Sequence, residues 1–135
     1  MMEFDAKQKV LIAVYAEYQK DLPNMKEEIK ANKLGLSGEV FKVALRKLQN
    51  ERLILGVNFA EGGGKLLSVY TDAIMMTREG ISYVENKLTI DEVKSGREKL
   101  EELSKKSAGW LWGEAKDIIS RTLSEIIQAN IQNNN

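Results

Sequence analysis

The stretch that decides the fold runs from residue 37 to residue 70 and reads SGEVFKVALRKLQNERLILGVNFAEGGGKLLSVY. Ser37 is a natural N-cap, and apolar side chains then recur every three or four residues, which predicts an amphipathic helix over residues 38–51. Two β-prone runs follow, residues 53–59 and 65–70, with a glycine cluster between them, and this pattern predicts a β-hairpin. A helix that leads directly into a hairpin is typical of the centre of a winged helix-turn-helix.

The preceding segments supply the other two helices of that fold. Apolar residues at helical spacing predict a helix over residues 4–20, which Pro23 ends. A short helix is expected over residues 25–31, and Gly35 suits the left-handed turn after it. We therefore expect an α+β winged helix-turn-helix, with three helices and a β-hairpin wing.

The chain after the hairpin predicts one further extended segment and one further helix. Residues 72–76 read as extended, and Thr77 is expected to cap a helix over residues 78–87. Its inward residues would be Ile81, Tyr83 and Val84. The winged-helix domain would then occupy residues 1–87.

The remaining sequence divides by composition. Residues 88–107 are rich in charge and predict a solvated helix or a linker. Residues 108–132 carry an isoleucine and leucine stripe, which predicts an appended C-terminal amphipathic helix. Residues 133–135 are expected to be a disordered tail.

Composition excludes most catalytic chemistry. The 135 residues include no His and no Cys, so catalysis by a Ser-His-Asp triad or a Cys-His pair and the usual zinc sites are impossible. The adjacent carboxylates do not converge on a helix, and the EGGGK stretch at residues 61–65 lacks the spacing of a phosphate-binding P-loop. We expect a protein that is not an enzyme and takes no cofactor or metal. The absence of cysteine and of a long apolar run favours a cytoplasmic protein with no membrane insertion.

The outer face of the helix at residues 38–51 is the candidate nucleic-acid-binding surface. Lys42, Arg46, Gln49 and Asn50 are side-chain types that pair with base edges in the major groove, and Lys65 would add a phosphate contact from the wing. The same residues also suit an ordinary solvated helix. Charge limits the DNA-binding interpretation, because residues 1–87 hold 13 basic and 12 acidic side chains.

The segment with two tryptophans leaves three interpretations open. The helix over residues 108–132 can pack on its own domain, pair with the same helix of a second copy, or lie on a membrane. Its slightly acidic polar face argues against the membrane. The candidate oligomer or partner interface consists of Trp110, Leu111, Trp112, Ile119, Leu123 and Ile126.

Two motifs resemble a known family. Residues 41–57, read as F-x-x-A-L-x-x-L-x-x-E-x-L-I-L-G-V, resemble the YjcQ-like family of small bacterial and prophage proteins. Residues 76–84, MTREGISYV, are similar to a signature that follows the wing in winged-helix proteins. The resemblance implies a prophage-type winged-helix protein of uncharacterised function. Our functional prediction is a regulatory protein that binds duplex DNA and forms a homodimer through its C-terminal helix. The alternative is a protein-interaction module that uses the tryptophan-containing helix.

Overall fold

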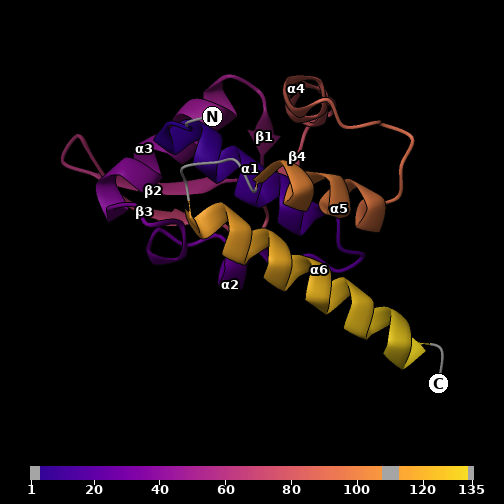
Figure 1. Ribbon diagram of the computed structural model, residues 1–135. Helices are drawn as coiled ribbons and strands as arrows, with labels where there is room; N and C mark the ends of the chain where they lie inside the picture. The colour runs from indigo at the N-terminus through magenta and orange to yellow at the C-terminus, as the bar shows by residue number, and fades with distance from the viewer. Residues whose placement is uncertain (1–3, 108–112, 134–135) are drawn as a thin grey trace.

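The computed structural model describes residues 4–107 and 113–133, with side chains described for residues 4–106 and 117–129. Figure 1 shows the elements in chain order. The helices are α1 (Ala6–Tyr18), α2 (Met25–Glu28), the 3-10 helix η1 (Asn32–Leu34), α3 (Gly38–Asn50), α4 (Arg78–Leu88), α5 (Gly96–Ser107) and α6 (Gly113–Asn133). The strands are β1 (Ile54–Leu55), β2 (Asn58–Gly62), β3 (Lys65–Tyr70) and β4 (Met75–Met76).

Local capping signals place the starts of α3 and α4 where the sequence predicts them, whereas α1 begins at Ala6, two residues later than predicted. The Ser37 side chain accepts a hydrogen bond from the backbone N–H of Val40 at 3.2 Å, and Thr77 accepts one from Gly80 at 2.9 Å. Gly35 has a φ of 68°, as its predicted left-handed turn requires. Asp5 also caps α1, in a capping box with Gln8.

The second helix is shorter than predicted. It ends at Glu28 because Ile29 leaves the helical region of backbone space, with φ −98° and ψ 88°. The Ile29 side chain is only 2% exposed, so the end of the helix places this apolar residue in the core before η1 begins.

The β-prone residues 53–59 do not form one strand of a single hairpin, as the sequence predicted. They divide at Gly56, which has a φ of 86° and whose Cβ, if it had one, would lie 1.9 Å from the carbonyl oxygen of Ala73. Before the break, β1 pairs with β4; after it, β2 pairs with β3. We call the β2–β3 hairpin the wing, and its tip extends beyond α3 (Figure 1).

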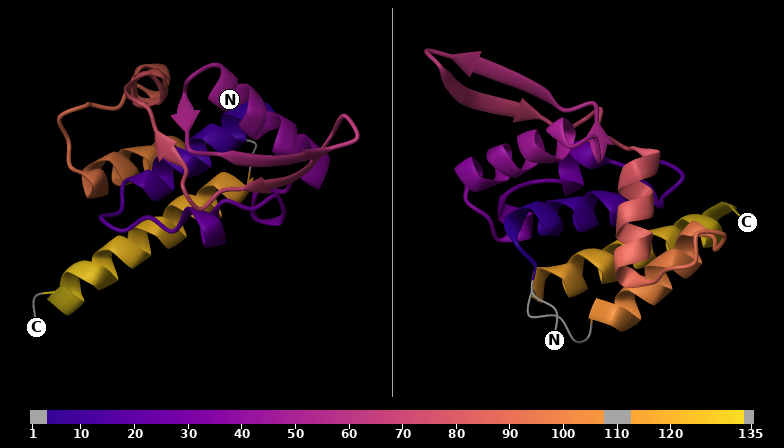
Figure 2. Two further views of the ribbon diagram at one scale, coloured as in Figure 1. Left: turned by 180° about the vertical axis from the view of Figure 1, so that it is seen from behind. Right: turned by 90° about the horizontal axis from the view of Figure 1, so that it is seen from above.

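Helix α1 is the centre of the molecule. Every residue from Val10 to Glu17 is buried, because other elements cover the helix on all sides. The right-hand view of Figure 2 shows the order: the wing, then α3, then α1, and then α5 with α6 on the opposite side. The C-terminal helices therefore leave α3 and the wing uncovered.

The charged segment that the sequence assigned to a solvated helix or linker is amphipathic. It contributes α5, in which Leu100 and Leu103 are fully buried in the same core as α1. Helix α6 adds Ile118 and Ile119 to that core. The prediction for α4 needs one correction, because Tyr83 is 40% exposed, whereas Val84 is buried as expected.

Ion pairs, one of them buried, attach the C-terminal helices to the rest of the chain. On α5, Lys99 Nζ lies 2.7 Å from Glu85 Oε2, and the same oxygen accepts a hydrogen bond from the Tyr15 hydroxyl at 2.8 Å. On α6, Glu125 pairs with Lys20. Arg121 Nη2 lies 2.9 Å from Glu28 Oε2 as an ion pair without hydrogen-bond geometry.

The arrangement is a mixed α+β fold compatible with a winged helix followed by C-terminal helices, as predicted. Within the described residues, no helix is long and apolar enough to cross a membrane.

Candidate nucleic-acid interface

The core face of α3 determines which of its side chains point outward. Phe41, Ala44, Leu45 and Leu48 are buried against α1 and the rest of the core. With a helical repeat of 3.6 residues, the opposite face then carries a mixed set of side chains. Its exposed members are Glu39, Val40, Val43, Arg46, Lys47 and Asn50.

Lys42 binds the wing. Its ammonium group donates hydrogen bonds to the carbonyl oxygens of Leu66 at 3.4 Å and Leu67 at 3.3 Å, both on β3. Both acceptors are uncharged carbonyl groups, so neither forms an ion pair with the lysine. Lys42 therefore both holds the wing against α3 and contributes charge beside it.

Gln49 is occupied by the backbone at the base of the wing. Its Oε1 accepts a hydrogen bond from the Val57 N–H at 2.8 Å, and its Nε2 donates one to the Val57 carbonyl at 3.0 Å. These are the donor and acceptor that a glutamine would offer to an adenine. In this structure the side chain links α3 to the residue before β2. The sequence alone did not distinguish this structural role from base recognition.

Arg46 also turns toward the wing. Its Nη1 lies 2.6 Å from Glu61 Oε1, and its guanidinium carbon lies 5.9 Å from the centre of the Phe59 ring. Phe59 and Glu61 are two residues apart on β2 and so project from the same face of the strand. Both partners of Arg46 therefore come from one strand of the wing.

Lys47, Asn50 and Lys65 are the remaining candidate contacts, and all three are exposed. Lys47 and Asn50 line a surface cleft of about 450 Å³ between α3 and β2, together with Val43 and Phe59. Lys65 is exposed at the start of β3, next to the tip of the wing. None of these three side chains has an acidic partner within the described residues.

The predicted oligomer or partner interface divides into two parts. Trp110, Leu111 and Trp112 lie outside the described residues. Ile119 is 1% exposed in the core of its own chain, and Leu123 and Ile126 pack against the same core. These three side chains of α6 are therefore used within the chain.

The described residues contain no group of three or more acidic side chains that could hold a metal ion. The most deeply buried acids, Glu17 and Glu85, are both engaged in ion pairs. Burial raises the pKa of the Glu17 carboxyl, although Lys20 and the Asn24 N–H oppose the change.

Comparison with known proteins identifies a family for this chain. A family model described as YjcQ protein matches residues 8–102, from the first turn of α1 into α5. The chain belongs to the YjcQ family. The match includes α3 and the wing and therefore the whole candidate interface. No curated protein and no solved structure matches the chain.

Proposed function

We propose that this YjcQ-family protein binds duplex DNA through α3 and the wing, without catalysing a reaction, as a cytoplasmic regulator of the prophage type. One observation carries the proposal. Lys26, Lys47 and Lys65 form no ion pair with any described acidic residue, and they lie on α2, α3 and the wing. Cations that are free to meet phosphate are the main source of affinity for DNA.

The contacts around α3 divide the predicted residues by role. Lys47 and Asn50 would reach the duplex directly, and Lys65 would contact a phosphate from the wing. Lys42 and Gln49 would position the wing, because their polar groups are already engaged with β3 and Val57. The C-terminal helices do not interfere with this surface, since they pack on the other side of α1 (Figure 2).

The test is fluorescence anisotropy with a short random-sequence duplex, measured over a series of salt concentrations. We expect binding at ~50 mM salt that weakens steeply as salt rises. Lys47→Gln with Lys65→Gln should reduce the salt slope by about two, because two phosphate contacts are lost. Lys87→Gln with Lys105→Gln removes the same charge from α4 and α5 and should leave the slope nearly unchanged. Absence of binding at ~50 mM salt would show that the proposal is wrong.

A second candidate, protein binding, is favoured by apolar exposure on the same face. Val40 and Val43 are each 45% exposed on α3, where a protein partner would bury them. The Trp110 and Trp112 side chains remain a predicted site for a partner or a second copy of the chain.

The Trp110→Ser, Trp112→Ser double variant tests that predicted site without removing α6, whose isoleucines are part of the core. The molar mass in solution should fall by half in this variant if the segment holds a homodimer. A monomeric parent protein would exclude the homodimer, and binding to DNA that is unchanged in the variant would separate the two surfaces.

A further inference from the structure

We propose that Glu61 competes with DNA phosphate for Arg46 and so lowers the affinity of the protein for duplexes of unrelated sequence. This inference rests on the proposed function. Arg46 is the arginine of the exposed α3 face, and its guanidinium is 2.6 Å from the Glu61 carboxylate. A carboxylate and a phosphate present similar paired oxygens to a guanidinium, so the wing offers Arg46 an intramolecular substitute for the DNA backbone.

The structure of the wing holds the Glu61 carboxylate next to the Arg46 guanidinium. Glu61 pairs with Leu66 across the hairpin, and the register shifts between Ala60 and Glu61, so that one additional β3 residue is accommodated there. Phe59, on the same face of β2, places its ring near the guanidinium. Lys42 and Gln49 hold the hairpin against α3 at two further points, so the carboxylate is kept close to Arg46.

The contact is exposed enough to exchange. The Arg46 and Glu61 side chains retain 56% and 51% of their accessible surface, so neither charge is buried by the pair. Exposed ion pairs contribute little free energy, and a DNA phosphate supported by other cations can displace the carboxylate. A duplex whose base sequence also contacts Lys47 and Asn50 would gain enough binding free energy to displace Glu61 from Arg46. A duplex that makes only phosphate contacts would displace Glu61 less readily. Glu61 would thereby favour specific over non-specific binding.

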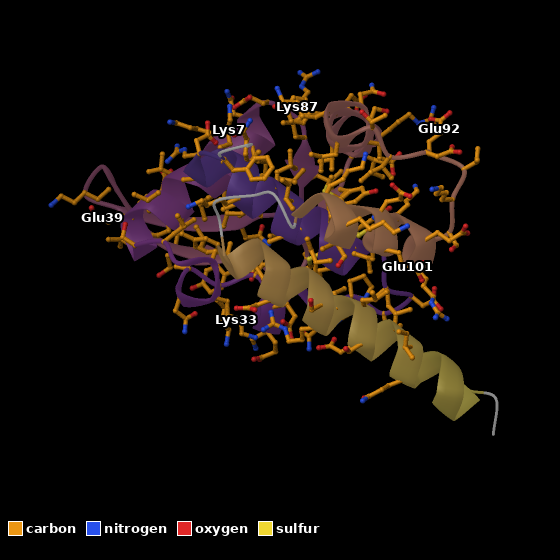
Figure 3. The ribbon with its side chains drawn as sticks, viewed as in Figure 1. Lys7, Lys33, Glu39, Lys87, Glu92 and Glu101 are labelled. Carbon is orange, nitrogen blue, oxygen red and sulfur yellow. The ribbon has the colours of Figure 1, made fainter. Side chains whose placement is uncertain are left out.

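Glu39 provides a matched control. It is an exposed acid at the start of α3 and forms no ion pair with the described residues. Figure 3 shows it at the end of the molecule that carries α3 and the wing, far from Glu92 and Glu101. Glu39→Gln therefore removes the same charge from the same region without releasing an arginine.

The experiment measures anisotropy of a random-sequence duplex at ~50 mM salt with Glu61→Gln, Glu39→Gln and each change combined with Arg46→Gln. We expect Glu61→Gln to tighten binding about five-fold and Glu39→Gln no more than about two-fold. In the Arg46→Gln background the gain from Glu61→Gln should fall to that of Glu39→Gln, because the released group is no longer present. Thermal melting of each variant confirms that the fold is intact.

Equal gains from Glu61→Gln and Glu39→Gln would overturn this inference, and so would a gain from Glu61→Gln that persists without Arg46. Salt-dependent binding by the unmodified protein would still support the proposed function in either case. If no variant binds the duplex, the proposed function is wrong and this inference falls with it.

Discussion

Replacing Lys99 with methionine tests whether α5 folds as one unit with the N-terminal part of the chain, α1 to α4. Lys99 Nζ is 2.7 Å from Glu85 Oε2, and the two side chains are only 13% and 4% exposed. Removing one member of a buried pair costs about 3–5 kcal/mol, because the remaining charge keeps its desolvation penalty. The Tyr15 hydroxyl still donates to Glu85, so we expect a loss of about 2–3 kcal/mol in the free energy of unfolding.

The assay is thermal and urea unfolding followed by circular dichroism. The expected loss corresponds to a fall in Tm of roughly 6–12 °C for a chain of this size. Lys105→Met is the control, since this lysine is exposed on the same helix and should change stability by less than about 0.5 kcal/mol. Adding Glu85→Gln to Lys99→Met should recover much of the loss, because no buried charge remains and the amide oxygen still accepts from Tyr15. Equal effects of Lys99→Met and Lys105→Met would refute this account of how α5 is attached.

Three further predictions concern alkaline stability, the wing and a close backbone contact. Burial and the hydrogen bond to Glu85 raise the pKa of the Tyr15 hydroxyl, so the contribution of this group to stability is complete below pH 10 and falls above it, where the tyrosine of the unfolded chain ionises. Tyr15→Phe should reduce this alkaline loss of stability in melting curves measured over a series of pH values. Gln49→Ala should lower the free energy of unfolding by about 1–3 kcal/mol and speed amide hydrogen exchange in β2, because the backbone of the buried Val57 loses both of its hydrogen bonds to the Gln49 side chain. Gly80→Ala should lower the free energy of unfolding by about 1–3 kcal/mol and the Tm by several degrees, since a Cβ there would lie 1.9 Å from the Leu53 carbonyl oxygen. An unchanged melting temperature would contradict this prediction.

The parts of the fold that the sequence predicts correctly depend on local interactions. The Ser37 and Thr77 caps and the left-handed Gly35 involve residues three or four positions apart, so their signals are present in any short window of sequence. The break at Gly56 is different, because the atom that requires it is the carbonyl oxygen of Ala73, on the far side of the wing. The residues near Gly56 in the sequence therefore do not predict this close contact with Ala73.

The candidate site shows the same division between local and distant information. The sequence identifies the outer face of α3, because the buried positions are periodic. It does not show that Gln49 binds Val57 or that Arg46 binds Glu61, since these pairings require the wing to fold back along the helix. Burial of α5 had one available signal, the spacing of Leu100 and Leu103 within a charged segment, but two apolar residues alone do not distinguish a buried helix from a solvated one.

The equal numbers of acidic and basic residues, 20 of each, have a structural explanation that bears on function. Lys20, Lys99 and Arg121 neutralise acids between the C-terminal helices and the rest of the chain, so these cations stabilise the fold and are not available to a ligand. The lysines without acidic partners on α2, α3 and the wing are left as a local excess that the overall balance conceals. A neutral net charge is therefore consistent with DNA binding here, because DNA responds to the charges that face it and not to those paired on the opposite side of α1.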